Sequence, residues 1–181
     1  MKTILATICL AAFAISAPAQ KFMTRTGKVT FFSSTPVENI EAYNNEAASA
    51  VDGATGDVMF IVPIKSFKFE KALMQEHFNE NYMESDKFPK AEYKGKITNI
   101  GEVNLKKDGT YKALTKGKLT IHGVTRDISV PGTIVVKGDK AVINTKFNVA
   151  PADYGIKIPS IAASKIAQKI EVTVNSELSP K

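Results

Sequence analysis

Few side chains in this 181-residue chain could act as nucleophiles, proton carriers or metal ligands. His77 and His122 are the only histidines, and Cys9 is the only cysteine. A zinc site would need carboxylates as additional ligands, and none occurs at a recognisable ligand spacing. The chain also contains no Gly-x-Ser-x-Gly elbow and no glycine-rich phosphate loop after a predicted strand. We therefore predict no catalytic residue, no metal and no cofactor.

His122 belongs to the most specific stretch of the sequence, which runs from residue 119 to residue 132. Apolar residues share one face of each of two extended segments: Leu119 and Ile121 in the first, Ile128 and Val130 in the second. The connection spans residues 122–125, with Gly123 supplying the turn, so the pattern predicts a β-hairpin. We expect His122 to make a hydrogen bond that fixes this connection. An enzyme would require His122 to pair with a carboxylate that lines a cleft.

Residues 1–19 are typical of a secretory signal peptide. A basic residue precedes an apolar core, residues 4–15, and Ala17-Pro18-Ala19 forms a small-x-small cleavage pattern. The apolar core is shorter than the roughly twenty residues that span a bilayer. Cys9 lacks a good lipobox, so lipidation is not expected. Cleavage would leave residues 20–181 as one cysteine-free domain, periplasmic or secreted, stabilised by packing and hydrogen bonds alone.

The formal net charge is +6 at pH 7, and lysines scattered along the chain carry the excess. A basic surface favours anionic partners such as phospholipid head groups or phosphates. It is equally consistent with a lysine-rich surface that only keeps the protein soluble. Nucleic acid is not an expected partner, because export is predicted and the chain lacks an arginine cluster or interleaved basic and aromatic residues.

Period-two alternation predicts about eight antiparallel strands. The segments that alternate, or are apolar on both faces, are residues 28–33, 48–51, 58–64, 91–97, 111–121, 128–136, 141–149 and 170–175. Turns are predicted at residues 52–57, 106–109 and 137–140, and residues 151–169 form one long loop. The pattern changes from strand alternation to a helical period only over residues 67–84. The apolar stripe of this segment contains Phe67, Leu73, Met74, Phe78 and Met83. We interpret this helix as core packing that covers the outer side of strand 58–64, or as a cap on one mouth of a barrel.

These elements predict an all-β fold, an antiparallel up-and-down barrel with one inserted α-helix. The interior of an eight-stranded barrel is either filled by side chains or holds one small ligand. Small residues alternate with aromatic ones on the inward face: Ala91, Gly95, Ala113, Gly117 and Ala141 beside Phe31, Phe60, Tyr93 and Phe147. This combination fits tight packing as well as the wall of an elongated tunnel, so periodicity alone leaves both alternatives open.

Three separated elements carry a resemblance to a known family. The run from Leu119 to Arg126, Leu-Thr-Ile-His-Gly-Val-Thr-Arg, resembles the signature of the YceI-like family. Asp86-Lys87-Phe88-Pro89, followed by Tyr93, is similar to that family's charged-aromatic-Pro element, and Asp153-Tyr154-Gly155-Ile156 is similar to its late loop. The elements occur in the family's order, and the similarity spans residues 27–178.

The resemblance implies a lipocalin-like barrel in the periplasm whose apolar tunnel holds an isoprenoid or a similar long-chain amphiphile. Lysines near a mouth would then be candidates to pair with a phosphate. A homodimer and peripheral contact with an anionic membrane are left open, and the alternative function is a filled barrel that acts as a structural or stress-protection module at the envelope. The candidate ligand-binding residues are Phe31, Phe60, Val62, Tyr93, Leu119, Ile121, Ile128, Val130, Ile134, Ile143, Phe147 and Val172.

The chain differs from the family pattern in three places, all of which we expect near the mouth. Ser33-Ser34 stands where many relatives have a histidine, and Tyr82-Met83-Glu84 stands where paired aromatics and an acid are common. Val149-Ala150-Pro151 replaces a region that usually contains an arginine. We expect these differences to affect the recognition of the ligand's head group rather than the tunnel.

Overall fold

The computed structural model describes residues 21–181. The predicted signal peptide and Cys9 lie outside these residues. Within the described part of the chain, no helix is both long enough and apolar enough to cross a membrane.

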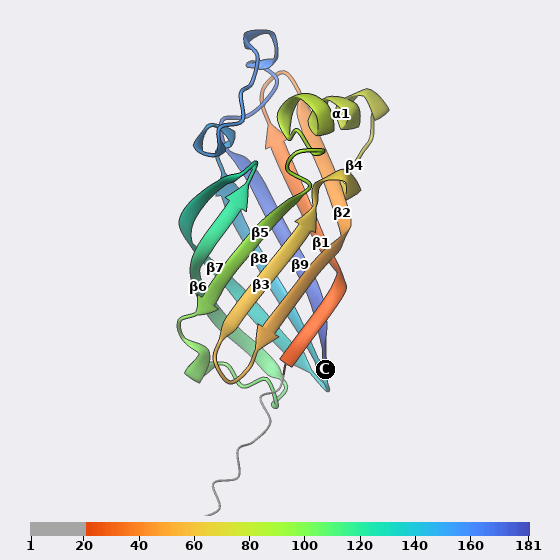
Figure 1. The fold of residues 1–181 in the computed structure, drawn as a ribbon. Helices are drawn as coiled ribbons and strands as arrows, with labels where there is room; N and C mark the ends of the chain where they lie inside the picture. The colour runs from red at the N-terminus through yellow and green to blue at the C-terminus, as the bar shows by residue number, and fades with distance from the viewer. Residues whose placement is uncertain (1–20) are drawn as a thin grey trace, which may run out of the picture.

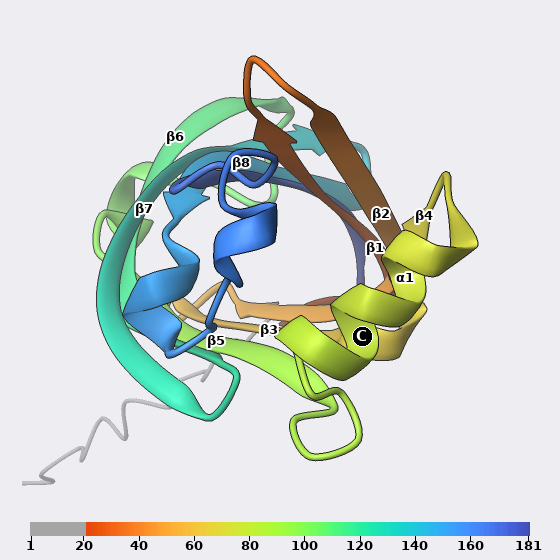
Figure 2. The same ribbon diagram turned by 90° about the horizontal axis from the view of Figure 1, so that it is seen from above.

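Eight strands form a closed antiparallel barrel (Figures 1 and 2). A ninth strand of two residues pairs with one of them at Ala42 and Tyr43. The sheet order is β1-β9-β8-β7-β6-β5-β3-β2-β4, and pairing of β1 with β2 closes the barrel. This confirms the predicted fold. The strands are β1 (Lys21–Ser34), β2 (Asn39–Asp52), β3 (Asp57–Pro63), β4 (Lys68–Phe69), β5 (Lys90–Ile97), β6 (Gly109–Ile121), β7 (Val124–Lys137), β8 (Lys140–Val149) and β9 (Ile170–Pro180).

The β6–β7 hairpin has a tighter turn than the sequence predicted. Ile121 pairs with Val124, so only His122 and Gly123 form the connection. Both have positive φ values, 50° and 75°, as a type I′ turn requires. Residues 124 and 125, predicted to lie in the connection, belong to β7.

Strand β2 begins at Asn39, nine residues earlier than the strand predicted from Ala48. Two features hide the pattern. The buried positions in the part of β2 that was not predicted are small or polar: Ala42, Asn44 and Ala47. The alternation also shifts where β2 faces Gly27 of β1, because the register between these strands is irregular there.

The predicted helix over residues 67–84 is present, but it is shorter than predicted and only residues 72–82 are helical. The segment begins in an extended conformation, and β4 pairs with β2 through Phe69 and Ala42. The α-helix α1 covers only Ala72–His77, and a π-helical turn, Phe78–Tyr82, follows it. Figure 2 shows α1 at one end of the barrel, beside its opening. The helix therefore caps a mouth instead of covering the outer side of β3.

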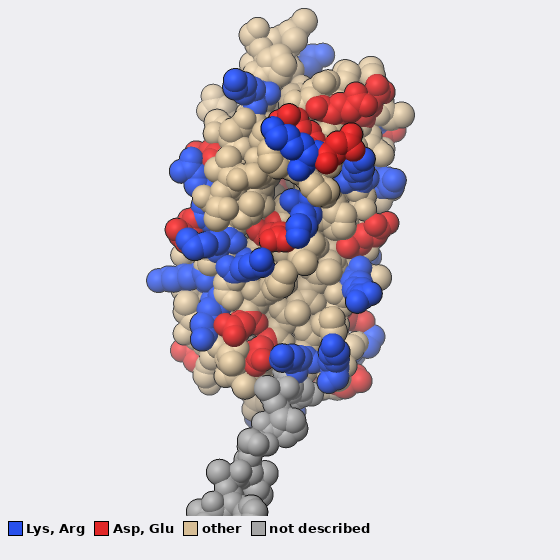
Figure 3. Space-filling view, viewed as in Figure 1, with Lys and Arg blue, Asp and Glu red and all other residues tan. Residues whose placement is uncertain are grey.

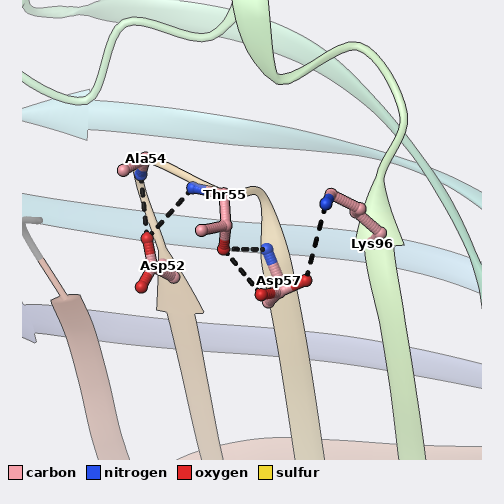
Figure 4. Close-up of polar contacts among 5 residues, drawn as sticks. All are labelled: Asp52, Ala54, Thr55, Asp57 and Lys96. Carbon is pink, nitrogen blue, oxygen red and sulfur yellow. Dashed lines mark hydrogen bonds and ion pairs between the residues drawn. The ribbon is translucent and has the colours of Figure 1, made fainter.

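The turn between β2 and β3 lies at the opposite end of the barrel (Figure 1) and has the predicted position. Figure 4 shows its polar contacts. Asp52 Oδ1 accepts hydrogen bonds from the backbone N–H groups of Ala54, at 2.9 Å, and Thr55, at 3.1 Å. These bonds, chiefly the one from Thr55, hold the pKa of Asp52 below its usual value. The Thr55 hydroxyl donates to Asp57 at 2.7 Å, and Lys96 lies 3.9 Å from the Asp57 carboxylate.

Candidate ligand-binding cavity

The barrel encloses a cavity of about 790 Å³ with a predominantly apolar lining. This volume lies in the range of pockets that bury a small organic ligand. Every residue predicted to contact a ligand lines this cavity, from Phe31 on β1 to Val172 on β9. Contact of these residues with a ligand stays a prediction. A filled barrel would have no continuous cavity. Because this barrel has one, the structure does not favour the alternative of a filled structural module.

One end of the cavity is closed by packed side chains, which we call the plug. Leu178 is 0% exposed and packs in one cluster with other apolar residues that do not line the cavity. They come from strand ends and from the loop between β5 and β6: Phe22, Val51, Val103, Leu105, Val136 and Ala141. The plug includes Ala141, which the sequence suggested as a wall residue. The plug therefore closes the cavity at this end of the barrel.

Tyr93 is a buried residue of the cavity lining that carries a polar group. Its hydroxyl donates to Thr115 Oγ1 at 2.8 Å, and the Thr115 hydroxyl donates to the Val130 carbonyl at 3.2 Å. Burial raises the pKa of Tyr93, and the bond to Thr115 partly offsets this effect. The phenol lies over Gly95, where a Cβ would come within 2.5 Å of the Tyr93 hydroxyl. The small residue at position 95 therefore makes room for this ring.

Four phenylalanines form a cluster on the wall beside α1. The ring centroids of Phe31 and Phe67 lie 5.3 Å apart, and Phe78 lies 5.1 Å from Phe69. All four rings line the cavity. The sequence analysis proposed only Phe31 as a ligand contact and assigned Phe67 and Phe78 to core packing on a helix. It missed Phe69, although alternation of Phe67 and Phe69 is a strand pattern that could have identified both.

The charged and amide side chains of the lining lie near α1 and the late loop, apart from Glu92 on β5, which is paired with Lys90 and Lys94. Lys71 and Lys165 are the lysines among the lining residues, and Lys71 Nζ lies 3.6 Å from the carboxylate of Glu38. His77 also lines the cavity at this end and is exposed. Within residues 21–181, no three His, Cys, Asp or Glu side chains gather as metal ligands would.

The late loop crosses this open end. We call residues 155–169 the strap. Its second end is tied to β1, because the Ala167 N–H donates to Ser33 Oγ at 2.9 Å. Ile156, Ile158 and Ile166 of the strap line the cavity. Figure 2 shows the strap lying across the opening opposite α1, so these two segments together form the rim of the mouth.

The comparisons with known proteins agree with this architecture. A model of the YceI-like domain matches residues 11–178. The chain belongs to the YceI-like family. None of the curated proteins searched by sequence matches it.

Several solved structures share the YceI-like fold at low sequence identity. A polyisoprenoid-binding domain from Saccharophagus degradans, implicated in plant cell wall breakdown, has a TM-score of 0.78 and 13% identity, covering 90% of this chain and 99% of that one. BcnA of Burkholderia cenocepacia has a TM-score of 0.69 and 16% identity, covering 84% and 96%. A Campylobacter jejuni YceI protein has a TM-score of 0.61 and 18% identity, covering 82% and 88%.

The three YceI-like sequence elements meet at one point of the rim. His122 Nε2 lies 2.7 Å from Glu84 Oε2, and its Nδ1 lies 3.3 Å from the Tyr154 carbonyl oxygen. The ring of Phe88 packs edge-on against His122, with centroids 4.6 Å apart. Arg126 Nε donates to the Asp153 carbonyl at 2.9 Å. The predicted hydrogen bonding of His122 is present, but it joins two other segments to the hairpin rather than fixing the turn itself.

The contacts of this junction are those of a structural support. His122 does pair with a carboxylate, yet neither His122 nor Glu84 lines the cavity. Both have positive φ values, 50° and 42°, so their backbone is held in an uncommon conformation. A Cβ on Gly123 would come within 2.6 Å of the Phe88 ring. The YceI-like signature therefore encodes the connection between the hairpin, the segment that follows α1 and the turn that precedes the strap.

Most of the positions that differ from the YceI-like pattern line the cavity, whereas Ser34, Glu84 and Ala150 do not. Ser33, Tyr82, Met83, Val149 and Pro151 all line the cavity. β7 pairs with β8 only from Gly132 to Lys137, so the first part of β7, residues 124–131, diverges from β8. The turn before the strap is joined to this diverging part of β7 by the Arg126 bond.

Proposed function

We propose that this YceI-like protein binds a polyisoprenoid or a similar long-chain amphiphile inside its barrel. The observation that carries the proposal is the cavity of about 790 Å³, closed by the plug at one end and lined by apolar side chains as far as the rim. Each CH₂ group that leaves water for such a site contributes about 0.8 kcal/mol. Similarity to the Saccharophagus degradans domain, whose ligand class is a polyisoprenoid, is consistent with this ligand.

We infer that an anionic head group would lie at the rim. Lys165 lines the cavity there and is not in an ion pair among residues 21–181, whereas Lys71 is paired with Glu38. A chain buried toward the plug would place its head group beside these lysines. The role would be transport, storage or sequestration of the lipid in the periplasm, after removal of residues 1–19. The intact mass of the exported protein tests this cleavage.

Mass spectrometry of lipid extracted from the purified protein tests the binding proposal directly. We expect a long-chain amphiphile to be recovered repeatedly, and we expect added isoprenoid to raise the melting temperature of delipidated protein. Repeated recovery of no hydrophobic molecule, together with no stabilisation by isoprenoids, would overturn the proposal.

Two neighbouring residues of β7 provide a matched test of the binding face. Ile128 lines the cavity, whereas Ser129 is exposed on the outer wall opposite Lys116. We expect Ile128→Glu to lower both lipid uptake and stability, because it places a charge in an apolar site. The same substitution at Ser129 should change neither measurably. Equal uptake by the two variants would show that the assigned inward face is wrong.

A further inference from the structure

The open end of the barrel exposes apolar side chains on three separate segments. Ile161 on the strap is 89% exposed, Val37 in the β1–β2 turn is 61% exposed, and Leu73 on α1 is 60% exposed. All three segments lie at the same end of the molecule in Figure 1. Exposed apolar groups that surround a cavity mouth are typical of an interaction surface.

The strap adds a positive charge to this surface. It contains three lysines and no acidic residue. Lys157 and Lys165 lie four positions before and after Ile161, and neither forms an ion pair within the described part of the chain. In Figure 3, acidic side chains at this end gather over the α1 side, and basic ones lie beside the strap. The strap therefore presents an apolar tip between two free cations.

The strap is also held in place on both sides. The segment before it is bonded to the hairpin through the Tyr154 and Asp153 carbonyls, and Ala167 is bonded to Ser33 of β1. The residues between these attachments include Ile161, which is largely exposed and also borders the cavity, together with Ile158 and Ile166, which line it. One continuous apolar path thus leads from the exposed tip to the interior.

We propose that the strap docks the open end of the barrel on a bilayer surface that contains anionic phospholipid. Ile161 enters the boundary between head groups and acyl chains, and the three strap lysines, Lys157, Lys165 and Lys169, contact the phosphates. An apolar side chain flanked by lysines is the pattern of an interfacial membrane contact. A second copy of this chain fits the surface less well, because two identical straps would bring like charges together.

Docking in this orientation places the mouth of the cavity against the bilayer. This step rests on the proposed function, since a long-chain amphiphile is poorly soluble and is found in membranes. The ligand could then move between bilayer and cavity along the apolar lining of the strap without passing through water.

Flotation of the purified protein with vesicles tests the proposal. We expect binding to phosphatidylcholine vesicles that contain phosphatidylglycerol, weak binding to phosphatidylcholine alone, and release by added salt. Ile161→Asp should lower the partition coefficient by about tenfold or more, because it removes the apolar anchor and adds an anion. Absence of binding to the anionic vesicles, or unchanged binding of Ile161→Asp, would overturn the proposal.

The outer wall of β6 offers matched controls. Leu114 is 39% exposed there, and Lys112 and Lys116 flank it on the same face. Leu114→Asp should bind vesicles as the unmodified protein does. The double variant K112E/K116E carries the same charge change as K157E/K169E, which alters the strap outside the cavity lining. Only K157E/K169E should weaken binding, by about tenfold. Equal losses in the two double variants would mean that net charge, and not the strap, determines binding.

Two further readouts separate docking from the other possibilities. Uptake of a fluorescent fatty acid from solution should be the same in K157E/K169E and in the unmodified protein. Vesicle binding by a protein that takes up no lipid would refute the proposed function and leave docking intact. Lipid uptake without vesicle binding would refute docking and leave the proposed function intact. A shift from dimer to monomer in Ile161→Asp, without any vesicle binding, would show that the rim joins two copies of the chain.

Discussion

At the plug, the strand ends carry apolar side chains that meet one another, and Leu178 and Phe22 are 0% and 1% exposed. At the rim, the same barrel carries apolar side chains that face a cavity or water, and Ile161 is 89% exposed. The strands that build both ends are continuous, so the difference comes from what is inserted between them. At the plug, short loops and the packed residues 103–105 close the end of the barrel. At the rim, α1 and the strap span the opening and leave space beneath them. We infer that the plug supplies stability and the rim supplies binding.

Leu178→Ala should produce the largest effect on stability. Leu178 pairs in register with Ala141 and has no exposed surface, so the truncation leaves a void in packed surroundings. We expect the free energy of unfolding to fall by about 2–5 kcal/mol in urea titrations of delipidated protein. Leu114→Ala on the outer wall, as the control, should cost less than about 0.5 kcal/mol. Equal costs would break the comparison, because the plug would then not be a rigid core.

Phe78→Ala should have a smaller effect on stability than Leu178→Ala and a larger effect on ligand binding. The Phe78 ring contacts the other three rings of the phenylalanine cluster beside α1, with centroids 5.1 to 5.6 Å away. Its free side already borders the cavity. We expect a loss of about 1–3 kcal/mol. The rise in melting temperature caused by added isoprenoid should also shrink in Phe78→Ala and persist in Leu178→Ala. The opposite pattern would show that the ligand lies against the plug.

The barrel and its inward face could be predicted from the sequence because strand alternation depends only on neighbouring residues. Ile128 and Ser129 point to opposite sides for this reason, whatever the rest of the chain does. Strand β2 was the exception, since Asn44 and its buried neighbours are small or polar and the register shifts near Gly27. An irregular register is a property of two strands and leaves little trace in either one.

The rim could not be predicted in the same way, because its structure depends on contacts between distant segments. The sequence suggested a long helix over residues 67–84, and tertiary packing of Phe67 and Phe69 onto β1 and β2 prevented its first part from forming. The role of His122 was equally hidden, since its partners Glu84 and Tyr154 lie 38 and 32 positions away. The family resemblance named all three elements of this junction but not their contact.

Tyr93→Phe tests the boundary between the two regions and should have the smallest effect near neutral pH. It removes the hydrogen bond to Thr115, which costs about 0.5–1.5 kcal/mol. Because burial raises the pKa of Tyr93 in the folded protein, the folded state keeps its proton where the unfolded state, with a pKa of about 10, loses it. The stabilisation is therefore complete below about pH 10 and is lost as the pH rises through the folded-state pKa.

Urea midpoints measured from neutral to strongly alkaline pH should thus fall less steeply for Tyr93→Phe than for the unmodified protein. Tyr154 provides the matched control at the rim, since burial and the nearby Asp153 also raise its pKa while Arg126 lowers it. Tyr154→Phe should reduce the alkaline slope as well, but only Tyr93→Phe should also change lipid uptake, because Tyr93 lines the cavity and Tyr154 does not. An unchanged slope in Tyr93→Phe would mean that water reaches this phenol freely, and the cavity would then be wet as far as Thr115.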